Sequence, residues 1–128
     1  MRRLTTIMGW ACVLIGAVHL VGGAATVPGE PAADPTVDSR ERFYAAVFVG
    51  YGLAWIRAAR QRPLPVADVR GLAAIMAVGG AARIGSWVQR GRPHWLQCVL
   101  TGVEVLLPVP FLLAPAHDGT PHEPPPRS

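Results

Sequence analysis

Residues 81–113 read AARIGSWVQRGRPHWLQCVLTGVEVLLPVPFLL, with one arginine inside an apolar segment and one glutamate inside the next. The turn between the segments, residues 90–93, is too short to separate them, so we expect two adjacent antiparallel helices. A charge inside lipid costs roughly 2.5 to 3.5 kcal/mol. Arg83 and Glu104 should therefore face each other or a wet cavity, with the rest of the chain as a scaffold around them.

The composition suits a membrane protein better than a soluble globule. Apolar residues make up 51% of the 128 residues and are gathered into four blocks. The formal net charge is +4, and all twelve basic residues are arginines. Most of them flank the apolar blocks and form no contiguous basic face, so nucleic acid is not an expected partner. They are better explained as topology signals.

Four helices account for most of the chain. Each predicted segment is near the length that crosses a ~30 Å hydrocarbon core at ~1.5 Å per residue. The fold class is therefore all-α, a four-transmembrane-helix antiparallel bundle in one domain over residues 1–114. The Pro-rich segment 115–128 is expected to be a disordered tail. The predicted helices cover about 4–27, 42–59, 66–88 and 94–113.

The arginine distribution favours a cytoplasmic location for both termini. A cleaved signal peptide is an alternative for the first apolar run, because residues 23–25 are small and precede a Pro-rich stretch. The length of the run favours a membrane helix instead. The cytoplasmic side would hold Arg2, Arg3, Arg57, Arg60, Arg62, Arg70 and Arg127, against Arg40, Arg42, Arg90 and Arg92 on the other side.

Two local patterns describe the first two helices. Gly9, Gly16 and Gly23 recur every seven residues, which predicts a smooth helical face that a neighbouring helix can approach closely. Residues 28–37 are Pro, Gly, Ala and acidic, and predict an exposed loop. Asp38 then has the position of a helix cap, with Glu41 three residues later in capping-box register.

Polar side chains form a stripe on the last predicted helix. Gln97, Thr101 and Glu104 lie at i, i+4 and i+7, on one face of an otherwise apolar segment. Pro108 lacks the N–H that would bond the main-chain carbonyl of Glu104, and a kink is expected there. In lipid that carbonyl needs another partner, supplied by a second helix, a water or a bound group.

Further polar residues are expected at the same level. Arg83 and Ser86 share a face of the third helix, His19 lies in the outer half of the first, and Arg42 begins the second. Two interpretations stay open: a buried ion pair that fixes helix register, or a ligand or proton site. The candidate site residues are His19, Arg42, Arg83, Ser86, Gln97, Thr101 and Glu104.

Neither a metal nor a cofactor is expected. His19, Glu104 and the two scattered cysteines in the apolar blocks show no ligand spacing. Cys12 and Cys98 both lie inside apolar segments, where thiols usually pack as small hydrophobes, so no disulfide is expected.

Four motifs occur in order along the chain. They are Asp38-Ser39-Arg40-Glu41-Arg42-Phe43-Tyr44, the Gly80-to-Ser86 run around Arg83, the Gly91-Arg-Pro93 turn, and Glu104 followed by Pro108. In this combination the chain resembles a family of small bacterial four-helix membrane proteins, domain of unknown function 4345. The resemblance implies a multi-pass protein of the cell inner (plasma) membrane and carries no established activity.

Three functions remain open. We favour a binding or permeation module in which Arg83 holds a small polar or anionic ligand, such as a lipid head group, and Glu104 supplies a counter-charge or proton acceptor. The alternative is a non-catalytic accessory or assembly subunit that packs against a membrane-protein partner or a second copy of itself. An enzyme that uses Glu104 and His19 as acid and base is least favoured. In each case the lipid bilayer is the expected surrounding.

Overall fold

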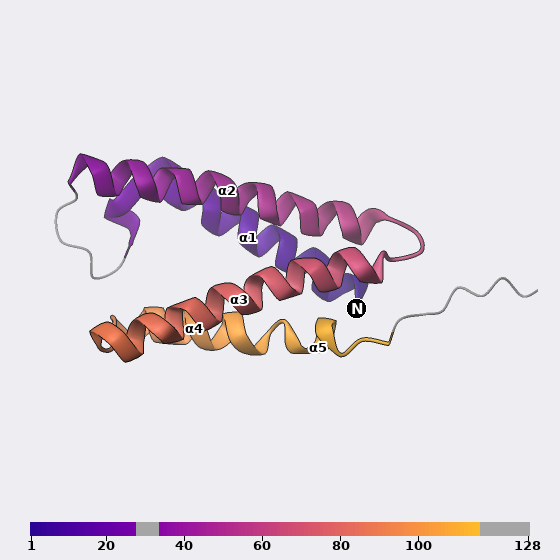
Figure 1. Ribbon diagram of the computed structural model, residues 1–128. Coiled ribbons are helices and arrows are strands. Elements are labelled where there is room, and N and C mark those ends of the chain that lie inside the picture. Colours follow the sequence, from indigo (N-terminus) through magenta and orange to yellow (C-terminus); the bar gives the residue numbers. More distant parts are fainter. Residues whose placement is uncertain (28–33, 116–128) are drawn as a thin grey trace, which may run out of the picture.

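The computed structural model describes residues 1–27 and 34–115, and the regular structure in these ranges is entirely helical (Figure 1). This confirms the predicted all-α class. The predicted loop over 28–37 lies partly outside the described residues. The predicted tail, 115–128, lies almost wholly outside them. The elements are α1 (Arg2–Gly22), the short 3-10 helix η1 (Gly23–Thr26), α2 (Pro35–Arg60), α3 (Val66–Arg90), α4 (Trp95–Leu106) and α5 (Val109–Leu112).

Three helical segments are long and apolar enough to cross a membrane: Arg2–Thr26, Val66–Arg90 and Trp95–Leu112. They correspond to the first, third and fourth predicted spans. The predicted second span, residues 42–59, lies inside α2, whose apolar middle is flanked by charged residues at both ends. A crossing by α2 therefore stays a prediction.

The start of α2 differs from the sequence prediction. The helix begins at Pro35, well before residue 42, and Asp34 is its N-cap, with a side chain that accepts from the backbone N–H of Thr36 at 3.0 Å. Proline suits the first helical turn because its missing N–H costs nothing there. The prediction that Asp38 caps this helix was therefore wrong, and Asp38 lies in the first turn instead.

Glycines hold α1 and α2 in close contact. A Cβ atom on Gly52 would lie 2.7 Å from the carbonyl oxygen of Gly9, and one on Gly16 would lie 3.0 Å from that of Ala45. These distances confirm the predicted smooth face for Gly9 and Gly16. Gly23 acts differently: its φ of 58°, in the left-handed region that favours glycine, ends α1.

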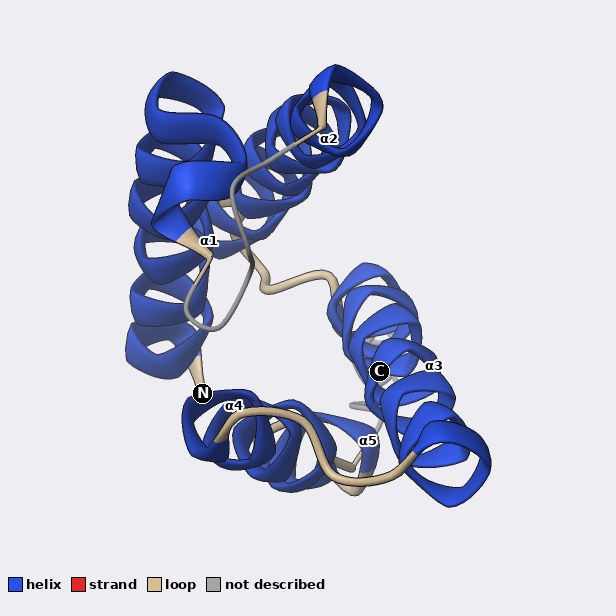
Figure 2. Ribbon diagram, turned by 90° about the vertical axis from the view of Figure 1, so that its left-hand side faces the viewer, coloured by secondary structure: helices blue, strands red, loops and turns tan. Residues whose placement is uncertain are grey.

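The helices form two pairs, α1 with α2 and α3 with α4 and α5 (Figure 2). The four long segments surround a common axis in the order α1, α2, α3, α4. The two pairs lie closest near the turn between α2 and α3 and diverge toward the opposite end (Figure 1). The diverging end is the one where α1 finishes and α4 begins.

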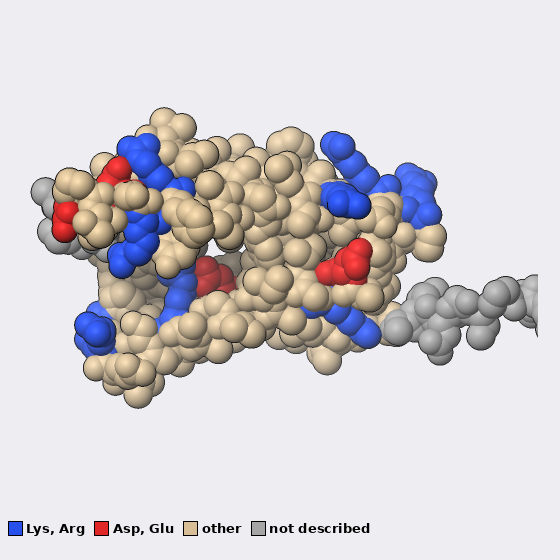
Figure 3. Space-filling view, turned by 45° about the horizontal axis from the view of Figure 1, so that its top comes forward, with Lys and Arg blue, Asp and Glu red and all other residues tan. Residues whose placement is uncertain are grey.

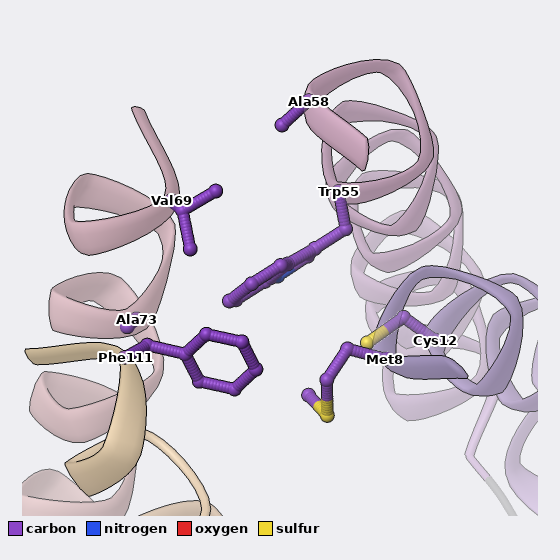
Figure 4. Packing of buried hydrophobic residues seen from close by; sticks show 7 residues of the cluster. All are labelled: Met8, Cys12, Trp55, Ala58, Val69, Ala73 and Phe111. Atoms are coloured by element: carbon purple, nitrogen blue, oxygen red, sulfur yellow. The ribbon is translucent and has the colours of Figure 1, made fainter. Parts of the chain in front are cut away.

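An aromatic contact joins the two pairs near the N-terminus. Trp55 of α2 and Phe111 of α5 are both 1% exposed, and their ring centroids lie 5.0 Å apart. The Trp55 ring extends from α2 toward Phe111, and side chains of α1 and α3 surround both rings (Figure 4). The Tyr51 hydroxyl adds a hydrogen bond to the carbonyl of Leu72 on α3. The buried cluster consists of Met8, Cys12, Trp55, Ala58, Val69, Ala73 and Phe111.

Candidate functional site

A cleft of about 350 Å³ separates the two helix pairs on the side away from the aromatic core. Its apolar wall includes Ile15, Phe48 and Leu100. Figure 3 shows this region of the surface hollowed, with acidic atoms recessed beside basic ones. The polar and ionisable side chains that line the cleft are His19, Glu41, Tyr44, Arg83, Gln97 and Glu104.

Arg83 bridges α3 to two residues of α4. Its Nε lies 2.9 Å from Oε2 of Glu104, and its NH1 donates to Oε1 of Gln97 at 2.7 Å. Gln97 and Glu104 lie two turns apart on one face of α4, which is the face predicted from their spacing. The chain reverses between the helices at Gly91, whose φ of 92° suits glycine. The structure thus brings three of the predicted site residues into direct contact.

The Arg83–Glu104 pair is unevenly buried. The Arg83 side chain is 43% exposed and the Glu104 side chain 24% exposed. Oε2 of Glu104 is itself buried, and it accepts no hydrogen bond from the described residues, although Nε of Arg83 lies 2.9 Å away. Buried polar atoms normally have a hydrogen-bond partner. The contact of this oxygen with Arg83 is therefore an ion pair without an additional hydrogen bond from the described residues.

The helix break below Glu104 follows from its prolines. α4 ends at Leu106, the chain turns through the buried Pro108, and α5 begins at Val109. Pro108 has no N–H to donate to the carbonyl of Glu104, and Pro110 has none for Leu106. The predicted kink is confirmed, and it places a main-chain oxygen without its usual helical partner next to the ion pair.

His19 faces the cleft from the end of α1. Its Nδ1 lies 2.7 Å from the hydroxyl of Thr26, and that hydroxyl also donates to the carbonyl of Gly23 at 2.7 Å. A hydroxyl has a single proton to donate. When Thr26 gives it to Gly23, Nδ1 of His19 must be the donor to Thr26, which leaves Nε2 for another partner.

Arg42, a predicted site residue, does not line the cleft. Its Nε donates to Asp38 at 2.7 Å, and its NH1 donates to the carbonyls of Leu20 at 2.8 Å and Val21 at 3.1 Å. It therefore satisfies main-chain oxygens at the end of α1. Asp38 also accepts from the backbone N–H of Ala24 at 3.0 Å. The hydrogen bonds from Arg42 and then from Ala24 hold the pKa of Asp38 below its ordinary value.

Ser86 and Thr101 do not belong to the cleft either. Ser86 is exposed on α3 and is not part of the cleft lining. Thr101 is 2% exposed, and its hydroxyl donates at 2.9 Å to the carbonyl of Gln97, one turn earlier on its own helix. Such a bond within a helix satisfies the hydroxyl locally and leaves it no part in the cleft.

Two of the polar lining residues, Glu41 and Tyr44, are absent from the predicted set. The late start predicted for the second helix placed Glu41 at its cap, facing its own backbone. With α2 beginning at Pro35, Glu41 lies inside the helix and shares a face with Tyr44 and Phe48. The Asp34-Pro35 pair was the signal for the earlier start, since an acidic cap followed by proline is typical of a helix N-terminus.

The described residues contain no group of three or more His, Cys, Asp or Glu side chains that could hold a metal ion. Cys12 and Cys98 are both free thiols. The chemistry that the cleft offers is therefore that of one guanidinium, two carboxylates, one imidazole, one amide and one phenol. These groups can bind a polar molecule or exchange protons with it.

The comparisons with known proteins give one match. The family model described as "Domain of unknown function (DUF4345)" matches residues 1–114, a range that includes every helix of the structure. No curated protein and no solved structure matches the chain.

Proposed function

The chain belongs to the DUF4345 family, and from the geometry of its cleft we propose that it is a membrane protein that binds a small polar or anionic ligand between its two helix pairs. A lipid head group is within this class. The family description assigns no activity, so the proposal rests on the site itself.

We place the protein in the inner (plasma) membrane as a four-span antiparallel bundle, with α2 as the remaining span and both termini cytoplasmic. Each long helix carries large apolar side chains on its outside. Ile7, Leu53, Ile75 and Val99, one from each of α1 to α4, are 53 to 63% exposed. Contiguous apolar surface of this kind marks contact with lipid or another protein. Its presence on α2 supports the fourth span.

The observation that carries the binding proposal is the buried Oε2 of Glu104, which lacks a hydrogen bond within the described chain. A ligand that donates a hydrogen bond would contact this carboxylate through the part of the Glu104 side chain that is exposed, 24% of it. Arg83 lies at the same point with 43% of its side chain exposed, so it can offer positive charge to an anionic or polar group. Intramembrane ionisable residues arranged in this way are costly to keep and usually functional.

The remaining lining fits a small amphipathic ligand. A volume of about 350 Å³ lies at the lower end of the range for small-molecule sites. Ile15, Phe48 and Leu100 would contact apolar parts of the ligand, while Nε2 of His19 and the Tyr44 hydroxyl would contact polar parts. Glu104 would act as a counter-charge or a proton acceptor. A passage for such a ligand across the membrane would follow the same cleft.

The alternative is an accessory subunit of a larger membrane complex. It is favoured by a shallow apolar groove of about 460 Å³ along α4 and α5 that includes Val99, Gly102 and Val103. A Cβ atom on Gly102 would meet nothing within 4 Å, so a partner helix could approach closely there. In that case the Arg83–Glu104 pair would only fix the register of α3 against α4.

Native mass spectrometry of the protein purified in mild detergent would test the binding proposal. Wild type is compared with Glu104→Gln and Arg83→Gln for small molecules that co-purify from the host membrane. Arg90→Gln is the matched control, because it removes an exposed arginine of the same helix that does not line the cleft. Wild type and Arg90→Gln should retain a bound molecule that both cleft variants lose.

Two results would contradict the proposal. One is a wild-type protein that carries no small molecule. The other is a molecule retained equally by the folded Glu104→Gln and Arg83→Gln variants. Co-purification of a larger complex that is lost on Gly102→Leu, with an empty cleft in every variant, would support the accessory role instead.

A further inference from the structure

A second cavity, of about 390 Å³, lies on the α1–α2 seam at the end that holds the N-terminus. It is separate from the cleft and shares no lining residue with it. The helices approach each other through glycine at this level, since a Cβ atom on Gly9 would lie 2.8 Å from the carbonyl of Gly52. The residues that line this seam groove are Trp10, Leu53, Ile56, Arg57, Arg60 and Gln61.

The seam groove is apolar at one end and basic at the other. Trp10 is 51% exposed and Leu53 is 54% exposed, while Ile56 is 7% exposed. Toward the end of α2, Arg57 and Arg60 follow at helical spacing and are both exposed. An elongated molecule with one apolar and one anionic part would match this order.

The two arginines have no partner in the described part of the chain. None of the ion pairs or side-chain hydrogen bonds found there involves Arg57 or Arg60, and no acidic residue lines the groove. Figure 3 shows basic side chains gathered at this end of the molecule. Arg2 adds to them, because its NH1 donates to the carbonyl of Ala59 at 3.4 Å.

The helix dipole opposes anion binding here and has to be weighed. The C-terminal end of α2 carries a partial negative charge of about half a unit, which disfavours a nearby anion. Three full positive charges, on Arg2, Arg57 and Arg60, lie at or beside this helix end. They outweigh the dipole, so attraction to an anion depends on the arginine side chains.

The expected position of the seam groove in the membrane indicates which kind of anion would bind there. Tryptophan is typical of the membrane–water interface, and arginine side chains extend from apolar surface toward the head groups. The arginine distribution favours a cytoplasmic location for this end, and anionic lipids create a negative surface potential on that side. A groove at the membrane–water interface would therefore meet phospholipid head groups before it meets soluble anions.

We propose that the seam groove is a binding site for an anionic phospholipid. Arg57 and Arg60 bind the charged head group, Gln61 donates an amide hydrogen bond to it, and an acyl chain lies against Trp10 and Leu53. The site is independent of the ligand proposed for the cleft, and either can be wrong without the other.

The test uses the full chain in nanodiscs of phosphatidylcholine with added phosphatidylglycerol of the same acyl chains, and native mass spectrometry counts the lipids retained. Wild type should retain phosphatidylglycerol in preference to phosphatidylcholine. Each arginine contributes about fivefold to such binding, so Arg57→Gln/Arg60→Gln should bind about 30-fold more weakly. Arg57→Lys/Arg60→Lys should stay within a few fold of wild type. Arg90→Gln/Arg92→Gln, with the same change of net charge at the opposite end, should bind as wild type does.

A second measurement needs no arginine variant and so does not depend on how those variants fold. Phosphatidylglycerol with brominated acyl chains should quench tryptophan fluorescence more than brominated phosphatidylcholine does, and Trp10→Phe should remove most of that excess. Equal retention of the two lipids by wild type would overturn the proposal. So would equal losses in the Arg57/Arg60 and Arg90/Arg92 double variants, because nonspecific charge attraction would then explain the binding.

Discussion

Removing either member of the Arg83–Glu104 pair should destabilise the protein by unequal amounts. The two side chains meet at 2.9 Å, but Arg83 is 43% exposed and Glu104 only 24% exposed. Arg83→Gln leaves a carboxylate whose Oε2 is buried and which forms no other ion pair among the described residues. Glu104→Gln leaves an arginine that can still reach water and keeps its bond to Gln97.

The exposed fractions of the two side chains determine how large each loss of unfolding free energy should be. Leaving a buried charged acceptor without its partner costs about 2 kcal/mol, so this is the expected loss of unfolding free energy for Arg83→Gln. A pair with one well-exposed member contributes less than about 1 kcal/mol, and Glu104→Gln should lose about 0.7 kcal/mol. The double variant, Arg83→Gln/Glu104→Gln, no longer contains an uncompensated charge. It should be more stable than Arg83→Gln alone, with a coupling energy of about 1 to 2 kcal/mol.

Reversible unfolding in mixed micelles with increasing sodium dodecyl sulfate would measure these differences. Far-UV circular dichroism follows the helices, and tryptophan fluorescence follows the core around Trp55. Arg90→Gln serves as the control, since Arg90 is exposed and takes no part in the described ion pairs, and it should change the free energy by less than about 0.5 kcal/mol. Equal losses for the two single variants, or a larger loss for Glu104→Gln, would refute the reasoning from unequal burial.

Two further predictions concern α2. Gly52→Ala should lower the unfolding free energy by about 2 kcal/mol in the same assay, because the new Cβ atom would lie 2.7 Å from the carbonyl of Gly9. Gly50→Ala is the control: its Cβ atom would lie in open space, so it should be neutral or slightly stabilising. Equal costs for the two variants would contradict the close contact. The hydrogen bond from Arg42 holds the pKa of Asp38 below its ordinary value. The ionised Asp38 therefore stabilises the folded protein at any pH above its unfolded pKa of about 3.9. This stabilisation is lost as the pH falls through the lower pKa that Asp38 has in the folded protein. Thermal unfolding from pH 7 to pH 2.5 should therefore show wild type and Asp38→Asn converging at low pH, and a constant difference would argue against this role.

The sequence was sufficient to predict contacts that depend on one helix or one short turn. The pairing of Arg83 with Glu104 is of this kind, because the turn at Gly91 fixes which residues of α3 and α4 lie side by side. The kink at Pro108 follows from a missing N–H and needs no tertiary information. Gly9 and Gly16 were recognisable because small residues at helical spacing permit close approach.

The predicted site was less accurate where a side chain forms hydrogen bonds to other groups instead of pointing into the cleft. Arg42 was placed beside the cleft from its position in the chain, but the carbonyls of Leu20 and Val21 and the carboxylate of Asp38 hold it at the end of α1. Sequence spacing cannot reveal this competition, because it involves side chains and carbonyls of two different helices. Thr101 was misplaced for a simpler reason: a threonine inside a helix can satisfy its hydroxyl on its own backbone.

The cleft could not be predicted from any single segment, because it depends on the angle between the two helix pairs. Trp55 and Phe111, which are distant in sequence and meet only in the folded chain, contribute a contact that joins the two pairs. Their bulk, together with the core around them, joins the pairs at one end and leaves them apart at the other. Glu104 lies at the boundary between these two regions. Its side chain is 24% exposed, and it lines the cleft.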